Sequence, residues 1–328
     1  MKAIICTAYG PPDVLKVQEV EKPRPKVDQV LIRIHAASVS RADCELRRFD
    51  FPSWVALPIR LWLGVLKPRI RILGQEFAGE VEAVGEGVTS FTPGDRVFGT
   101  TGMRLGAYAE YLCLGRSSPG SVLACMPANL SYAEAAAVPY GASEALRFLR
   151  KGNIQAGQKV LIIGAGGSFG TFAVQLAKLF GAEVTAVDSA SKLEMLLSLG
   201  ADHVIDYTQG SFADSTQTFD IIFDVVCKAP FAHLLRMLRP SGRCVLANPH
   251  TSHLVRGLWT TMTGDRKVIF GSDTGSVEHL LYIKELVETG KLRPVIDRTF
   301  PIEQTAEAHR YAETEQKKGN IVITVVQA

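Results

Sequence analysis

Hydrophobic and polar positions follow two different patterns along the chain. Through the first 123 residues, short apolar runs are separated by turn residues, such as those at 10–12 and 93–95. Runs of this kind predict short strands, and the glycine and proline positions between them reverse the chain. The predicted strands lie at 3–6, 30–39, 79–84, 96–98 and 108–112. This part of the chain is therefore expected to be mostly β.

After Pro127 the pattern becomes an alternation of helices and strands. An alanine-rich stretch predicts a helix over 132–150, and amphipathic or helix-forming segments then separate several apolar runs. The predicted strands lie at 160–163, 184–187, 203–206, 221–226, 243–247 and 268–271. Wholly apolar strands in such an alternation are typical of a parallel sheet with helices on both faces. We expect an α/β Rossmann domain with a doubly wound parallel sheet.

The last part of the chain predicts helices at 277–289 and 302–312 and a strand at 321–326. This strand has no sheet of its own, so we expect it to return to the first domain. A chain of 328 residues is long enough for two domains, which we expect from its length. We predict a mostly β domain over 1–123, completed by 270–328, and a dinucleotide-binding domain over 124–269.

A glycine-rich loop follows the apolar strand at 160–163 and precedes a helix-forming run at 171–180. Glycines in this context let the backbone approach a pyrophosphate, whose charge is met by N–H groups at the positive end of the helix. A methyltransferase uses a related loop and is the main alternative for this segment. The predicted cofactor-binding residues of the loop are Gly164, Gly166, Gly167, Ser168, Phe169 and Gly170.

Asp188 ends the second strand of the alternation, 22 residues after Gly166. An acid near this spacing accepts hydrogen bonds from the adenosine ribose, which favours NAD over NADP. The alternative is that Asp188 only precedes a helix capped by Ser191 and Glu194. Ser189 and Lys192 are also placed to receive a 2′-phosphate, so NAD and NADP both stay open.

Charge and cysteine content exclude several classes of function. The 36 basic and 33 acidic residues leave a net charge of +3, which gives no signal for nucleic acid or for an anionic membrane. The six cysteines have no CxxC spacing, so we expect reduced, mostly packed thiols. The first residues do not resemble a secretory signal, and the longest apolar run, at 54–66, is too short and interrupted for a membrane span. We expect a cytoplasmic protein.

Four segments together resemble the medium-chain dehydrogenase/reductase superfamily: GQEFAGEVEAVGEGVTSFTPGDRVFG (74–99), GAYAEYL (106–112), the glycine loop and GADHVIDY (200–207). The form GAGGSFGTFAVQLAK (164–178) is most similar to the quinone oxidoreductase, or zeta-crystallin, branch. The resemblance implies a GroES-like catalytic domain, a Rossmann domain and a cofactor in the cleft between them. It also implies a homodimer.

The positions that carry zinc ligands in related alcohol dehydrogenases match Ser40 and Gln75 here. Neither is a plausible ligand, because zinc is bound by thiolate, imidazole or carboxylate. The four-cysteine lobe of those enzymes is missing from 85–120 as well, so we predict a site without metal. Without a Lewis acid, alcohol oxidation is harder, whereas a quinone or an α,β-unsaturated carbonyl is already electrophilic.

The predicted catalytic residues are Ser40 and Tyr140. Ser40 stands where quinone reductases usually have asparagine and still offers a hydroxyl donor, while Asp43 is expected to hold the local loop rather than to move protons. Tyr140 falls in the stretch 138–146 that lines the nicotinamide pocket in the family, although a packed tyrosine is an equal alternative. Further cofactor contacts are implied at Val226, Asn248 and Asn320, with a turn role as the alternative for Asn320.

The segment 54–72 combines two tryptophans, aliphatic residues and several basic residues. It could line an acceptor pocket, form a subunit interface or rest on a membrane surface, and the first two are favoured. The sequence thus predicts an NAD(P)H-dependent, zinc-independent reductase of an apolar quinone or α,β-unsaturated carbonyl. The alternatives are a zinc-free alcohol dehydrogenase-like enzyme and a non-catalytic nucleotide-binding regulator.

Overall fold

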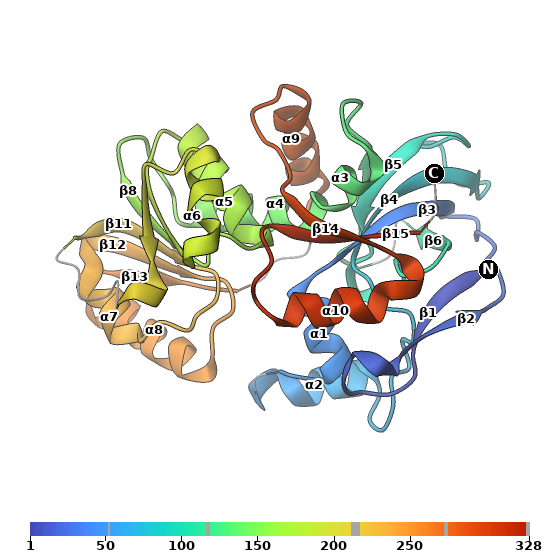
Figure 1. Ribbon diagram of the computed structural model, residues 1–328, viewed down its shortest axis with the longest axis horizontal. Helices are drawn as coiled ribbons and strands as arrows, with labels where there is room; N and C mark the ends of the chain where they lie inside the picture. The colour runs from blue at the N-terminus through green and yellow to red at the C-terminus, as the bar shows by residue number, and fades with distance from the viewer. Residues whose placement is uncertain (52, 116–118, 211–216, 272–274, 326–328) are drawn as a thin grey trace. The chain divides into compact units, whose positions relative to one another are not determined.

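The computed structural model describes the chain except for residues 52, 116–118, 211–216, 272–274 and 326–328. It forms two compact units (Figure 1). Unit 1 comprises Met1–Ser143, Thr274–Gly290 and Pro294–Ala328, and unit 2 comprises Glu144–Asp273 and Lys291–Arg293. The domain boundaries expected from the sequence, after residues 123 and 269, stay predictions.

Unit 2 is built on a six-stranded parallel sheet with the order β10-β9-β8-β11-β12-β13. The strands are β8 (Lys159–Ile163), β9 (Glu183–Asp188), β10 (His203–Asp206), β11 (Phe219–Asp224), β12 (Leu238–Leu246) and β13 (Lys267–Ile269). This is the doubly wound order of dinucleotide-binding domains, in which the direction of winding reverses between β8 and β11. The predicted Rossmann sheet is confirmed.

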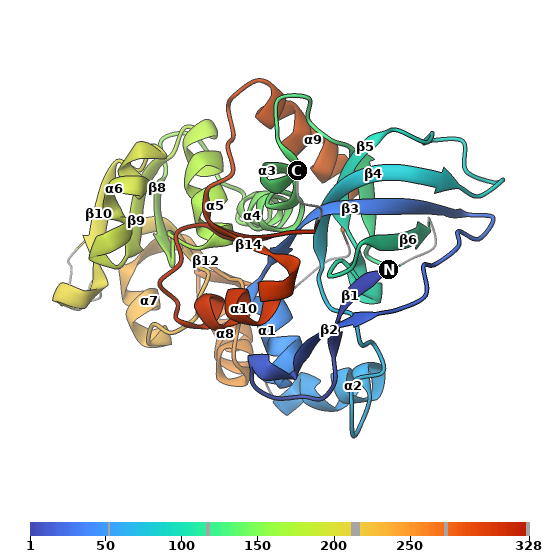
Figure 2. The same cartoon turned by 45° about the vertical axis from the view of Figure 1, so that its right-hand side comes forward.

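Helices cover both faces of this sheet. They are α4 (Pro139–Lys151), which begins in unit 1, α5 (Ser168–Leu179), α6 (Ala190–Ser198), α7 (Phe231–Met237) and α8 (Thr251–Thr263), with a short η3 (Tyr207–Gln209). Crossover connections in parallel sheets are right-handed, so winding in opposite directions from the centre places α5 and α6 opposite α7 and α8. Figure 2 shows this separation.

Unit 1 contains a seven-stranded sheet with the order β14-β15-β3-β4-β5-β7, in which β6 also pairs with β3, and a two-stranded sheet β1-β2. The strands are β1 (Lys2–Cys6), β2 (Leu15–Glu19), β3 (Gln29–Val39), β4 (Glu76–Val84), β5 (Arg96–Thr100), β6 (Tyr111–Gly115), β7 (Val122–Cys125), β14 (Ile296–Pro301) and β15 (Asn320–Thr324). β15 lies between β14 and β3, so the predicted return of the last strand to the first domain is confirmed.

The helices of unit 1 are α1 (Arg41–Arg48), α2 (Ser53–Leu63), α3 (Tyr132–Ala136), α9 (Val277–Glu288) and α10 (Thr305–Glu313), with the short η1 (Pro12–Val14), η2 (Gly102–Arg104) and η5 (Ile302–Gln304). The single helix predicted over 132–150 is wrong, because the chain forms α3 and α4 there. Pro139 has no N–H to continue α3, and it stands at the first position of α4, where none is needed. Within the described residues, no helix is long and apolar enough to cross a bilayer.

Candidate functional site

The glycine loop of unit 2 connects the buried strand β8 to helix α5. Gly164 has a φ of 78°, and a Cβ there would lie 2.8 Å from Cγ1 of Val226, two residues after the end of β11. A Cβ on Gly170 would collide with the carbonyl oxygens of Gly164 and Ala165. Both glycines are therefore required by the packing of the loop on its own strands and helix.

Gly167 differs from these two positions. It is the N-cap of α5 with a φ of −88°, and the nearest atom to a Cβ there would be 3.7 Å away. The backbone at the positive end of α5 is thus approachable, as the binding of a pyrophosphate requires. This open position is the structural observation that best fits a dinucleotide.

Asp188 ends β9 next to the loop and is already hydrogen-bonded. Its Oδ2 accepts the N–H of Gly166 at 2.7 Å, and its Oδ1 accepts the N–H of Ser189 at 2.9 Å. Lys192 Nζ lies 3.0 Å from Oδ1, and both side chains of this ion pair are almost fully buried. A Cβ on Gly166 would collide with Lys192, so the pair also packs against the loop.

The helix after β9 begins two residues earlier than a cap at Ser191 would require. α6 starts at Ala190, its N-cap is Ser189, and no side-chain cap bond forms there. The capping box of Ser191 and Glu194, offered as the alternative role for this region, is therefore wrong. The hydroxyls of Ser189 and Ser191 instead lie 3.4 Å apart at the start of α6.

The ends of β11 and β12 complete this edge of the sheet. Asp224 is buried, and its Oδ1 accepts the N–H groups of Val226 and Cys227 at 3.1 and 2.8 Å. Burial raises the pKa of Asp224 to about 6. Asn248, after β12, donates from Nδ2 to the carbonyl of Val225 at 2.9 Å.

Because parallel strands end at one edge, the predicted residues of unit 2 come together there. They are Gly164, Gly166, Gly167, Ser168, Phe169, Gly170, Asp188, Ser189, Lys192, Val226 and Asn248. Sequence reasoning missed Asp224, although an acid ending an apolar strand beside the glycine loop was a usable signal.

The two predicted catalytic residues lie in unit 1. Ser40 is the N-cap of α1 and forms a capping box with Asp43. The Ser40 hydroxyl donates to Asp43 Oδ2 at 2.7 Å and accepts the Asp43 N–H at 3.1 Å. The expectation that Asp43 holds its loop is confirmed. Burial raises the pKa of Asp43 to about 6 despite these bonds.

Glu76, at the start of β4, connects the end of β3 to the start of α4. It accepts hydrogen bonds from the Ser38 hydroxyl and from the Tyr140 N–H, the latter at 2.7 Å. Only 3% of Glu76 is exposed, and burial raises the pKa of its carboxyl to about 7. Sequence reasoning missed this residue, although it directly follows Gln75 in the family-like segment.

The remaining candidate residues of unit 1 are Tyr140 and Asn320. Tyr140 is half-buried at the second position of α4. Asn320 is buried and donates from Nδ2 to the carbonyl of Val295 at 3.1 Å, which fits the turn role. A cofactor contact of Asn320 stays a prediction.

The positions that match zinc ligands offer poor donors. The Ser40 hydroxyl is used by Asp43, and Gln75 Oε1 is buried without a hydrogen-bond partner. Across the described residues, no three His, Cys, Asp or Glu side chains gather as a metal site would need. All six cysteines are free thiols and five of them are buried, as expected.

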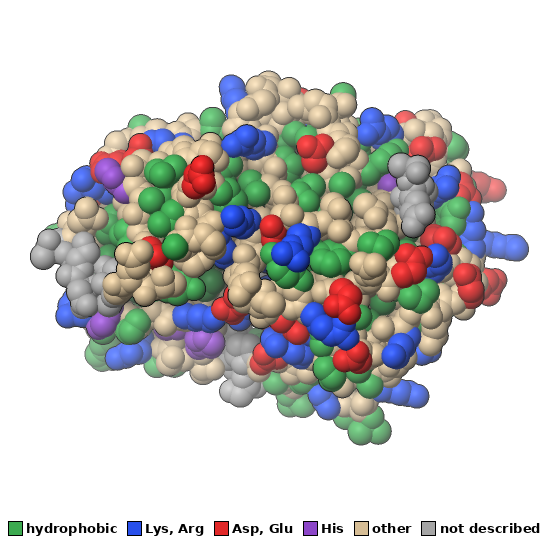
Figure 3. All heavy atoms as spheres, viewed as in Figure 1, with side chains coloured by type: hydrophobic (Ala, Val, Ile, Leu, Met, Phe, Trp, Pro, Cys, Tyr) green, Lys and Arg blue, Asp and Glu red, His purple; other side chains and the backbone are tan. Residues whose placement is uncertain are grey.

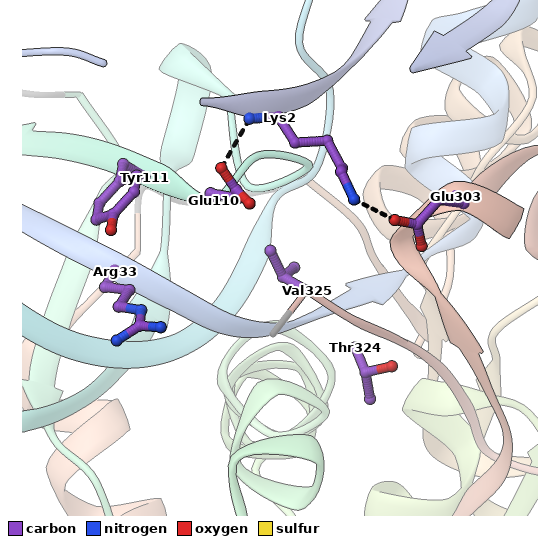
Figure 4. A pocket seen from close by; sticks show the side chains of 7 residues that line it. All are labelled: Lys2, Arg33, Glu110, Tyr111, Glu303, Thr324 and Val325. Carbon is purple, nitrogen blue, oxygen red and sulfur yellow. Dashed lines mark hydrogen bonds and ion pairs between the residues drawn. The ribbon is translucent and has the colours of Figure 1, made fainter. Parts of the chain in front are cut away.

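A polar pocket of about 340 Å³ also lies in unit 1 (Figure 4). The Lys2 N–H donates to Glu110 Oε2 at 2.7 Å, and the Lys2 ammonium pairs with Glu303. Arg33 and Tyr111 line the same pocket. Its cations and carboxylates are balanced, and it contains none of the predicted site residues, so we assign it no part in the reaction.

Comparisons with known proteins agree with this architecture. Residues 26–127 match the model of the alcohol dehydrogenase GroES-like domain, and residues 199–323 match that of the zinc-binding dehydrogenases. Residues 133–228 match the C-terminal domain of alanine dehydrogenase/PNT.

Relatives cover nearly the whole chain. A 2-methylene-furan-3-one reductase of Solanum lycopersicum is 34% identical over 98% of this chain and 79% of its own. A chloroplastic NADPH-dependent alkenal/one oxidoreductase of Arabidopsis thaliana is 30% identical over the same shares. The structure of the quinone oxidoreductase from Coxiella burnetii superposes with a TM-score of 0.88 at 29% identity, covering 99% of each chain. The chain belongs to the medium-chain dehydrogenase/reductase superfamily, in its zinc-free quinone oxidoreductase branch, whose members are oxidoreductases that use a nicotinamide dinucleotide.

Proposed function

We propose that this protein is an NAD(P)H-dependent reductase of quinones or α,β-unsaturated carbonyls. The observation that carries the proposal is the open backbone at Gly167 beside the N-terminus of α5. The names of the relatives, which include a 2-methylene-furan-3-one reductase, an alkenal/one oxidoreductase and a quinone oxidoreductase, support the class of acceptor. When bound, a reduced nicotinamide supplies a hydride to such an acceptor.

The residues of unit 2 bind and orient the dinucleotide in this proposal. The N-terminus of α5 meets the negative charge of the pyrophosphate. Asp188 accepts hydrogen bonds from the adenosine ribose, and Lys192 and Ser189 lie where a 2′-phosphate would be met. Because Lys192 offsets the charge of Asp188, both reduced coenzymes are expected to bind, with NADH preferred.

The residues of unit 1 act on the acceptor. Nothing at positions 40 and 75 ionises an alcohol, so the favoured substrate already carries an electrophilic carbon. Its developing oxyanion needs a hydrogen-bond donor. We assign this role to the Tyr140 hydroxyl, with the Ser40 hydroxyl as a second donor whenever it turns away from Asp43.

A panel of acceptors tests the proposal: 1,2-quinones, 1,4-quinones, enones and aldehydes, each with NADH and NADPH, followed by nicotinamide absorbance. Turnover of quinones or enones is expected. Oxidation of alcohols alone would favour the alcohol dehydrogenase alternative, and coenzyme binding without any turnover would favour a regulator. Stoichiometric, tightly held zinc in the purified protein would refute the zinc-free mechanism.

Assembly and location are part of the same proposal. We expect a homodimer in the cytoplasm, and light scattering on the purified protein measures the first point. The names of the relatives include a chloroplastic and a mitochondrial protein, so the compartment differs among similar proteins, and imaging the full chain in cells determines it here.

A further inference from the structure

Helix α2 and the turn that follows it present apolar and basic side chains to solvent. The exposed apolar residues are Leu57, Leu61, Val65 and Leu66, and the exposed basic residues are Lys67, Arg69 and Arg71. We call these seven residues the α2 tip. We propose that the α2 tip rests on the surface of an anionic phospholipid bilayer. This inference does not depend on the proposed reaction.

The outward face of α2 is left exposed because its inward face is already packed. Leu63 is fully buried in the core of unit 1, and Ile59 and Trp62 pack against that core. On the other side of the helix, Leu57 is 68% exposed and Leu61 is 59% exposed. No clear amphipathic pattern was expected here from the sequence, but the folded helix has a second apolar face that does not pack against the core.

The turn after α2 is held in a fixed shape that points its apolar residues outward. The Tyr9 hydroxyl donates to the Gly64 carbonyl at 2.7 Å, and the Arg69 N–H donates to the Leu63 carbonyl at 2.6 Å. Gly64 has a φ of 120°, and a Cβ there would collide with the Lys67 carbonyl. Leu66, within this turn, is 91% exposed. Figure 1 shows the turn projecting from unit 1 below α2.

The charge of this region has a single sign. Residues 51–75 contain four basic side chains and no acidic one. Arg60 lies over the rings of Tyr9 and Phe49, with its guanidinium 5.0 and 4.3 Å from their centroids. The preceding acid, Asp50, pairs with Arg48. The other three cations therefore face solvent, and Figure 3 shows hydrophobic and basic side chains together at the lower edge of this view, over α2.

This combination fits an anionic bilayer better than a second copy of the chain. Apolar side chains on a short helix and turn enter the boundary between headgroups and acyl chains, while lysine and arginine remain among the phosphates. Two copies docked through the same surface would bring three cations against three cations, which is unfavourable. Charge complementarity therefore selects the lipid surface.

Vesicle sedimentation of the full chain tests the proposal. We expect binding to mixed phosphatidylcholine and phosphatidylglycerol vesicles, little binding to phosphatidylcholine alone, and weaker binding as salt screens the charges. Each basic side chain near a surface contributes about a fivefold gain in binding, so K67Q/R69Q/R71Q should lose on the order of a hundredfold. Leu66→Ser should lose affinity as well, and its exposure makes a folding defect unexpected.

A matched variant separates the tip from total charge. R24Q/K26Q/K318Q removes the same charge from exposed positions of unit 1 outside the tip and should keep most of the binding. Equal losses in the two triple variants, or equal binding to neutral vesicles, would overturn the proposal. So would a concentration-dependent dimer that Leu66→Ser abolishes, since the tip would then be an interface between copies. Circular dichroism of each variant confirms its folding.

Discussion

Glu76 is a carboxylate with almost no contact with water. The Ser38 hydroxyl and the Tyr140 N–H both donate to it and lower its pKa, but burial outweighs them, and the charge of Asp43 raises the pKa further. The resulting value of about 7 is well above the ordinary 4.5. Near neutral pH the protonated and the ionised form of this buried carboxyl are therefore both populated.

The Glu76 carboxyl makes stability depend on pH. Its folded-state pKa lies above its unfolded-state pKa, so its stabilising contribution is full below pH 4.5 and is lost as pH rises through about 7. Glu76→Gln, which stays neutral, should become more stable relative to wild type across this window, by at most about 3 kcal/mol. Urea unfolding at a series of pH values measures this. A difference that does not change with pH would contradict the assignment.

Asp188 is the residue on which coenzyme preference depends. Asp188→Ser removes the acceptor for the ribose and the ion pair with Lys192, so the affinity for NADH should weaken by about tenfold while NADPH binding is kept or improved. Fluorescence titration with both coenzymes measures the two dissociation constants. Asp206→Ser, at the end of the neighbouring β10, is the control and should change neither. Equal losses for both coenzymes in Asp188→Ser would give the aspartate a purely structural role.

Spacing along one segment was enough to predict from the sequence that Asp188 lies beside the glycine loop. Asp188 follows the glycine loop at a distance set by one β-α-β unit, and the loop does contact it. Glu76 and Tyr140 are 64 positions apart, and their hydrogen bond depends on how β4 meets α4. No local sequence pattern predicts that contact between β4 and α4. The raised pKa of Glu76 follows from burial, which arises only when the chain folds.

At the scale of elements, the loop between β8 and α5 can be tested by substituting two of its glycines, Gly170 and Gly167. Gly170→Ala should destabilise the protein by several kcal/mol, because its Cβ would overlap two carbonyl oxygens. Gly167→Ala should fold normally, since a Cβ has room there, but should weaken both coenzymes by at least about tenfold by blocking the pyrophosphate. Thermal melts and coenzyme titrations separate the two effects. Unchanged coenzyme affinity in Gly167→Ala would remove the main support for the dinucleotide site.

Elements in unit 2 were predictable because their signals are strong and local. Strands buried on both faces are continuous apolar runs, and the predicted strand at 160–163 lies within β8. In unit 1, the strand predicted at 108–112 lies at 111–115, and α2 was not predicted. Pro58 inside α2 argues against a helix on propensity, whereas the inner face of the folded helix packs on the core, which the sequence pattern does not show.

On the scale of the whole molecule, unit 1 joins segments from both halves of the sequence. Arg47 on α1 is fully buried, donates to the Gly10 carbonyl at 2.7 Å and pairs with Glu313 on α10. This pair spans 266 positions of the chain. It holds the late helix α10 to the early helix α1.

Breaking this ion pair should destabilise unit 1. Glu313→Gln leaves a buried guanidinium without its carboxylate and should lower the free energy of unfolding by about 3 kcal/mol. Glu307→Gln, on the same helix, breaks an exposed pair with Arg310 and should cost less than about 1 kcal/mol. Denaturant unfolding followed by fluorescence compares them. Similar small losses would mean that packing and the hydrogen bond to the Gly10 carbonyl are enough to stabilise Arg47.

The position of β15 between β14 and β3 has a consequence for biosynthesis. When unit 2 has left the ribosome, the sheet of unit 1 still lacks β14 and its neighbour β15. The end of β3 at residues 36–39, which pairs with β15, therefore remains open in the nascent chain until residues 320–324 emerge, and its unpaired backbone is a place where a chaperone, or another unfinished chain, can attach.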